Sequence, residues 1–127
     1  MLIGVPKQIK NHEYRIGLTP ASVQELTASG HQVLVEVKGG AGIGFYDDEY
    51  IAAGAQMAVT PEEIFAKADM IVKVKEPQIK ECKMLRPGQI LYTYLHLAPD
   101  FDQTKLLVES GAICIAYETV TDSKGAL

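Results

Sequence analysis

The chain contains 127 residues, of which 47% are hydrophobic and 22% are charged, and its formal net charge is −4. This length and composition are ordinary for one globular domain with a hydrophobic core. The negative charge, with no cluster of lysine and arginine, argues against non-specific binding of nucleic acid. No apolar run approaches the roughly 20 residues of a membrane-spanning helix. The N-terminus lacks the basic region and long apolar core of a signal peptide, so we expect a cytoplasmic location and no membrane contact.

The first part of the chain predicts strands that alternate with helices. An apolar run over residues 2–5 predicts a strand. Thr19 is a good N-cap and Pro20 suits the first helical position, so a helix is expected to begin there. That helix ends at Gly30, because glycine readily adopts the backbone that follows a helix. Residues 31–37 then predict a second strand.

The same alternation continues through the middle of the chain. A short helix is predicted over residues 47–54, with Asp47 as its cap, and a short strand over residues 55–59. The sequence Thr60-Pro61-Glu62-Glu63 predicts a capping box with proline in the first turn. The helix that it begins is expected to run to about Ala68. An apolar strand over residues 70–75 follows.

The last part predicts two more strands and two more helices. Residues 77–85 favour a short helix, and the apolar run from Ile90 predicts a buried strand that stops on His96. A helix is expected over residues 100–110, followed by a strand over residues 112–117. Six strands that alternate with four or five helices predict an α/β fold, Rossmann-like or flavodoxin-like, with a mostly parallel sheet and helices on both faces.

The glycine-rich loop over residues 38–44 follows a strand and precedes a helix, as a dinucleotide-binding loop does. Its spacing does not fit that function. The pattern Gly-x-Gly-x-x-Gly that starts at Gly40 meets Phe45 at its last position, and the one that starts at Gly42 meets Asp47. The next strand also offers no acidic residue for a ribose. We therefore interpret the loop as a tight turn where the backbone passes close to another segment, and we expect no cofactor-binding residues in this chain.

Three side chains stand after predicted strands, where ligands collect in parallel α/β sheets. They are Arg15, Lys75 and His96. Each has a plainer explanation: an arginine paired with Glu13 or with solvent, a solvated strand-end lysine that shares its face with Lys73, and a histidine that only makes structural hydrogen bonds.

Together, the three residues suit a 2-oxo acid. The arginine would hold the carboxylate, the lysine would polarise the keto oxygen and the histidine would move a proton. None of them can carry a hydride. The three histidines are not spaced as a metal site, so we expect no metal. Cys82 and Cys114 are expected to be reduced thiols without a catalytic role.

The residues around these positions closely resemble the N-terminal part of alanine dehydrogenases. The resemblance covers essentially the whole chain in the right order. Its segments are Gly4-Val5-Pro6-Lys7, residues 11–20, Gly40-Ala41-Gly42 with Gly44-Phe45 and Tyr50, residues 73–77, and Tyr92-Thr93-Tyr94-Leu95-His96-Leu97-Ala98. The related transhydrogenase alpha subunit shares the Arg and Thr-Pro region but is not expected to carry the last element. Gln8 replaces an expected glutamate, which is a minor departure in a loop.

This resemblance implies NAD-dependent interconversion of L-alanine and pyruvate. It implies that Arg15 and Lys75 bind the substrate, that His96 is the catalytic acid/base, and that the enzyme is a homo-oligomer. Members of the family are much longer, and a second domain binds NAD and carries a catalytic aspartate. The resemblance therefore implies that residues 1–127 form an N-terminal substrate domain, incomplete and without the NAD-binding domain, with exposed apolar surface.

Two alternatives for the function stay open. The chain is either an enzyme part that is active only with the missing domain, or a non-catalytic module. Such a module would bind a 2-oxo acid or associate with full-length subunits.

Overall fold

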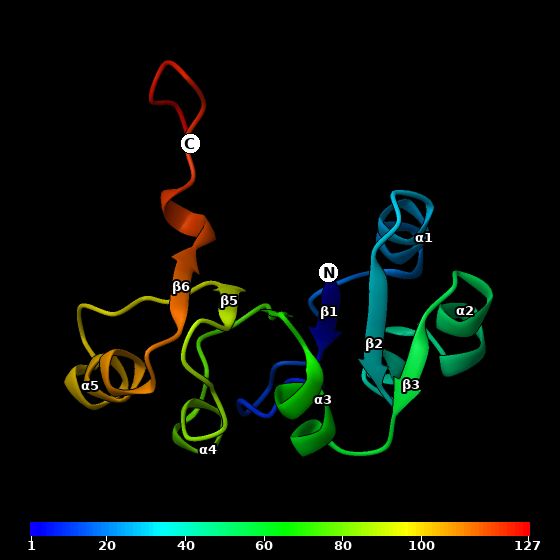
Figure 1. Cartoon of the computed structure of the whole chain (residues 1–127), viewed down its shortest axis with the longest axis horizontal. Helices are drawn as coiled ribbons and strands as arrows, with labels where there is room; N and C mark the ends of the chain where they lie inside the picture. The colour runs from blue at the N-terminus through cyan, green and yellow to red at the C-terminus, as the bar shows by residue number, and fades with distance from the viewer.

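The computed structural model describes residues 1–127 and contains one six-stranded sheet (Figure 1). Every strand pair is parallel, and the strand order is β3-β2-β1-β4-β5-β6. The strands are β1 (Leu2–Val5), β2 (Gln32–Glu36), β3 (Gln56–Ala58), β4 (Met70–Val72), β5 (Ile90–Thr93) and β6 (Ile113–Ala116). This is the order of a doubly wound Rossmann sheet, so the predicted α/β class is confirmed.

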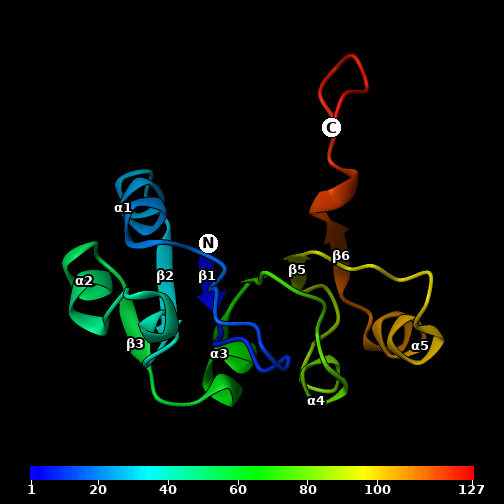
Figure 2. The ribbon, with the colours of Figure 1, turned by 180° about the vertical axis from the view of Figure 1, so that it is seen from behind.

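Five helices connect the strands and cover the sheet unequally (Figures 1 and 2). They are α1 (Pro20–Ala28), α2 (Asp47–Ala52), α3 (Pro61–Lys67), α4 (Ile79–Cys82) and α5 (Phe101–Ser110). α3, α4 and α5 contribute residues to the hydrophobic core on one face. α1 and α2 contribute to the core on the opposite face, where they lie against β2 and β3. None of these helices is long and apolar enough to cross a membrane.

Side chains of successive strand residues alternate between these two cores. Leu34 of β2 belongs to the core on the α3 face, whereas Val33 and Val35 belong to the core on the α1 face. In β4, Ile71 and Val72 divide in the same way. Continuous apolar runs are therefore explained by burial on both faces of a parallel sheet.

The predicted helix starts are largely confirmed. The Thr19 hydroxyl accepts a hydrogen bond from the N–H of Ser22 at 3.2 Å, and Thr60 accepts one from Glu63 at 3.3 Å. The capping box predicted at Thr60 is only half formed, because the Glu63 carboxylate binds Lys67 at 2.7 Å instead. Asp47 is not the cap of α2, since its carboxylate accepts the N–H of Lys38 at 2.7 Å.

Three elements near the predicted site residues are shorter than the sequence predicts. The strand expected to continue to Lys75 ends at Val72, and the helix expected over residues 77–85 covers only Ile79–Cys82. β5 likewise ends at Thr93, so His96 lies in the loop beyond it. In the two strand segments, the backbone beyond the strand is bound by side chains from other loops: Gln8 binds Lys75, and Glu118 binds His96.

β6 differs from the other strands because none of its residues is fully buried. Cys114 and Ala116 pack against the core on the α5 side. Ile113 and Ile115, which alternate with them and face the other way, are 55% and 38% exposed. The face that α1 and α2 cover over β2 and β3 therefore stays open over β6. We call the exposed Ile113 and Ile115 side chains the open face.

Candidate functional site

The loops that follow the carboxyl ends of the strands carry all three predicted site residues. Arg15 lies in the loop after β1, Lys75 in the loop after β4 and His96 in the loop after β5. β1, β4 and β5 are neighbours in the sheet. The parallel topology therefore brings these loops to one edge, where ligands of such sheets usually bind.

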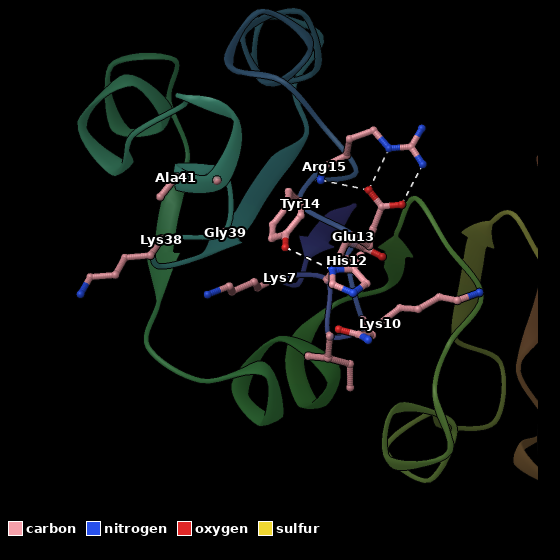
Figure 3. Close-up of a pocket in the computed structure, with 13 residues that line it drawn as sticks. Lys7, Lys10, His12, Glu13, Tyr14, Arg15, Lys38, Gly39 and Ala41 are labelled. Atoms are coloured by element: carbon pink, nitrogen blue, oxygen red, sulfur yellow. Dashed lines mark hydrogen bonds and ion pairs between the residues drawn. The ribbon is translucent and has the colours of Figure 1, made fainter.

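Arg15 is held by Glu13, two residues earlier (Figure 3). Its Nε and Nη2 atoms donate to the two carboxylate oxygens at 2.8 and 2.7 Å, and its backbone N–H donates to Oε1 at 3.0 Å. The hydrogen bond from Arg15 lowers the pKa of Glu13 to about 2. The Arg15 side chain is 60% exposed. Because guanidinium has five N–H donors and Glu13 takes two, the Nη1 edge remains for a second carboxylate.

A cavity of about 450 Å³ lies beside Arg15, between the loop after β1 and the glycine loop. Four cations line it: Lys7, Lys10, Arg15 and Lys38. Lys7 and Lys38 extend to one side of it and Arg15 to the other (Figure 3). Lys75 and His96 do not line this cavity. The largest cavity is thus next to the predicted site and is not the site itself.

The glycine loop makes close backbone contacts, as predicted. A Cβ atom on Gly39 would lie 2.7 Å from the Cδ1 atom of Ile16, and one on Gly40 would lie 2.8 Å from the carbonyl oxygen of Phe45. Larger residues cannot fit these positions without movement of the backbone. The protein fills the Cβ side of these glycines, whereas Gly39 also lines the cavity beside Arg15.

Side chains from two other segments bind the backbone N–H and the backbone carbonyl of Lys75. Its N–H donates to Gln8 Oε1 at 3.3 Å, and its carbonyl accepts from Thr93 Oγ1 at 2.9 Å. Its ammonium lies 4.9 Å from the ring centre of Tyr94, close enough for a cation–π interaction. The lysine is half-buried and directed by these contacts.

Lys73 does not share the position of Lys75, contrary to the prediction from strand alternation. Its ammonium is buried and lies 2.8 Å from the carboxylate of Glu81, with 1% and 2% of the two side chains exposed. It also donates to Gln8 Oε1 at 3.3 Å. Gln8 is buried, so its replacement of the expected glutamate is not a minor change in a loop. It joins the buried ion pair to the backbone of Lys75.

His96 is exposed and has a left-handed backbone, with φ of 45°. Its Nδ1 atom lies 3.2 Å from the hydroxyl of Tyr94, and the two rings stack with 5.5 Å between their centres. Its backbone N–H donates to Glu118 Oε1 at 2.9 Å. Tyr94 therefore connects His96 to Lys75, since it contacts both side chains.

Tyr117 extends this group toward Arg15. Its ring lies 6.3 Å from that of Tyr94, and its hydroxyl donates to the carbonyl of Val74. Burial raises the pKa of Tyr117, and the positive charge of Arg15 opposes that rise. The charge of Lys75 also adds to the low pKa of Glu13. Glu13 and Tyr117 thus lie near Arg15, and Tyr94 lies between Lys75 and His96 and near Tyr117.

Sequence reasoning missed several members of this group. Glu13 is predicted only as an ion-pair partner that would leave Arg15 without a function in binding. Tyr94 was treated as part of a buried strand, and Tyr117 as the end of one. Glu118 follows the last predicted strand and carries no predicted function. Only the residue types, an aromatic ring beside a histidine and an acid beside an arginine, offered any signal.

Comparison with known proteins identifies the family of the chain. Residues 4–127 match the family described as alanine dehydrogenase/PNT, N-terminal domain. The chain belongs to this family. It is 50% identical over its whole length to an alanine dehydrogenase of Halomonas elongata, and 51% identical over 120 residues to one of Methanococcus maripaludis. It covers 34% and 32% of those proteins, so it spans about a third of their length.

Solved structures agree. A structure titled L-alanine dehydrogenase superposes with a TM-score of 0.94 at 44% identity, over 99% of this chain and 35% of that one. A transhydrogenase from Sinorhizobium meliloti superposes with a TM-score of 0.88 over 98% of this chain and 37% of that one. The latter is 24% identical, which shows a common fold.

Proposed function

We propose that this chain is the substrate-binding part of an NAD-dependent alanine dehydrogenase. The reaction converts L-alanine, NAD⁺ and water to pyruvate, ammonium, NADH and a proton. The observation that carries the proposal is the convergence of Arg15, Lys75 and His96 at one edge of the sheet, on three separate loops. Relatives that bear the name alanine dehydrogenase and align with the whole chain support it.

Each residue has a defined task in this proposal. The Nη1 edge of Arg15 binds the substrate carboxylate, because Glu13 occupies the other edge. Lys75 donates to the keto oxygen of pyruvate, where negative charge develops as ammonia attacks the carbonyl carbon. His96 gives or takes the proton at that oxygen. Tyr94 contacts both of the last two side chains and so holds them in place.

The hydride acceptor is NAD, and we propose that a region beyond the aligned third of the relatives binds it. The spacing of the glycine loop supports this division, since it does not match the Gly-x-Gly-x-x-Gly pattern of a dinucleotide-binding loop. This chain then contributes carboxylate binding, keto-oxygen polarisation and proton transfer, and the cofactor contributes the redox chemistry.

A second candidate function is a non-catalytic module that binds a 2-oxo acid or associates with full-length subunits. The open face on β6 favours it, because exposed isoleucines on an edge strand are suited to contact with another polypeptide. The same surface suits subunit contacts in the homo-oligomer that we propose for the complete enzyme.

Calorimetric titration with pyruvate tests the site, with NADH oxidation in the presence of pyruvate and ammonium measured in the same buffer. We expect Arg15→Ala to weaken binding by about tenfold or more, because a charge-assisted pair is lost. Lys38→Ala is the matched control, since it removes an exposed cation near the site without touching the group. Binding that is equal in both variants would contradict the proposed role of Arg15. Turnover by the chain alone would contradict the assignment of NAD binding to another region.

A further inference from the structure

We propose that Glu118 is a positioning residue that holds His96 in its working orientation. This inference rests on the proposed function, in which the His96 ring moves a proton. Glu118 does not touch the ring; it acts through the backbone of His96 and of the preceding residue. The group that orients the acid/base thus comes from the segment that follows β6.

The backbone of His96 needs such support. Its φ of 45° places a residue with a Cβ atom in the left-handed region, which costs free energy for every residue except glycine, although asparagine, aspartate and histidine adopt it more often than other residues. Backbones of this kind persist where the surroundings hold them, and they occur often at functional sites. The left-handed turn directs the ring of His96 back over that of Tyr94, where the two stack.

Glu118 supplies two of the contacts that hold this turn. Its Oε1 atom accepts hydrogen bonds from the N–H groups of Leu95 at 3.0 Å and of His96 at 2.9 Å. Its Oε2 atom lies 3.3 Å from the nitrogen of Leu95. On the other side, the buried side chain of Gln103 donates to the carbonyl of Leu95 at 3.2 Å. The peptide unit before His96 is therefore held from both sides by side chains distant in sequence.

Glu118 is itself well placed by the fold. It lies in the short 3₁₀ turn η2 (Tyr117–Thr119), directly after β6. The register of the sheet aligns Ala116 with Thr93, so the turn lies beside the start of the loop that carries His96. The hydroxyl of the preceding residue, Tyr117, donates to the carbonyl of Val74, which attaches the turn to the loop after β4. These contacts place the carboxylate beside the two N–H groups.

The charge state of Glu118 agrees with this role. Partial burial opposes ionisation, but the N–H groups of His96 and Leu95 and the positive charge of His96 together lower its pKa. Glu118 is therefore an ionised acceptor at neutral pH. Ionised acceptors make stronger hydrogen bonds with backbone N–H groups than neutral ones.

NMR spectroscopy of the chain separates positioning from simple structural support. In Glu118→Ala, we expect amide exchange at Leu95 and His96 to accelerate about tenfold or more, and the contact between the rings of Tyr94 and His96 to be lost. Glu118→Gln keeps an acceptor oxygen in a side chain of the same shape. Its amide exchange and its ring contact should therefore stay close to those of the unsubstituted chain. Thr119→Ala is the control, because it alters the same turn without contacting the His96 loop. It should leave both signals unchanged.

Two results would overturn the proposal. One is a folded Glu118→Ala variant with an unchanged His96 amide and an unchanged ring contact. The other is a Thr119→Ala variant that disturbs both to the same degree. The pyruvate-induced shift of the His96 ring signal should also be lost in Glu118→Ala. If Arg15→Ala leaves pyruvate binding intact while Glu118→Ala still releases the loop, the proposed function fails and the positioning role stands.

Discussion

The two halves of the sheet are stabilised differently. In the half formed by β3, β2 and β1, helices lie on both faces, and three successive residues of β2 are buried: Val33, Leu34 and Val35. In the half formed by β4, β5 and β6, one face of the edge strand is open, and the loops carry a buried ion pair and two of the three candidate site residues, Lys75 and His96. The comparison teaches that apolar burial on both faces secures the first half, whereas the second half combines an apolar core on the α5 face with polar contacts between its loops.

The largest effect should come from the buried ion pair in the second half. Lys73→Met leaves the carboxylate of Glu81 buried without a counter-ion, which should lower the free energy of unfolding by about 3–5 kcal/mol. The double variant Lys73→Met/Glu81→Leu removes both charges and should recover much of that loss. Urea unfolding measures each. A small effect of the single variant would show that polar contacts do not secure this half.

Two isoleucines, one in each half, allow a direct comparison of how much a buried and an exposed apolar side chain contribute to stability. Ile64→Ala in α3 should cost about 2–5 kcal/mol, since this side chain is fully buried over the first half. Ile113→Ala in β6 should change stability by about 0.5 kcal/mol, because the side chain is 55% exposed. Urea unfolding of both variants checks the contrast. Equal losses would mean that the open face is covered in solution.

Acid unfolding tests the contact between Glu13 and Arg15. The pKa of Glu13 is lowered to about 2 in the folded chain, against about 4.3 in an unfolded one. A carboxylate with a lowered folded pKa adds stability above the unfolded value, and that contribution is lost as the pH falls from about 4.3 toward 2. Glu13→Gln should therefore flatten the stability curve in this window.

The expected loss for Glu13→Gln at neutral pH is about 1 kcal/mol or less, because Arg15 is exposed to solvent. Glu25→Gln in α1 serves as the control, since Glu25 is exposed and forms no salt bridge. If both variants show the same curve between pH 4 and pH 2, Glu13 does not contribute to acid stability.

The smallest effect is expected for an exposed pair in the first half. Lys67 of α3 lies 2.7 Å from Glu63, one helical turn earlier, and both side chains are accessible to solvent. Lys67→Ala should lower the free energy of unfolding by about 0.3–0.5 kcal/mol, and less at high salt. A loss as large as that of Lys73→Met would show that burial does not distinguish the two ion pairs.

Local signals in the sequence account for much of the fold. The alternation of apolar runs and capped helices predicted all six strands and five helices, including α1 from Pro20 and the end of α5 at Gly111. These features depend on neighbours within a few residues, so they can be deduced from the chain. The same is true of the placement of Arg15, Lys75 and His96 after three different strands, because parallel topology brings strand ends to one edge.

Contacts between distant loops were decided only by the tertiary structure. Gln8 binds the N–H of Lys75, 67 residues away, and Glu118 binds that of His96, 22 residues away. The sequence around each gave no sign of its partner, since these side chains have no periodic pattern. Where Lys73 was expected beside Lys75, the strand ends at Val72 and the Lys73 side chain is buried against Glu81. A polar side chain's role depends on which loop folds beside it, whereas an apolar side chain's role is already set by its position in the pattern.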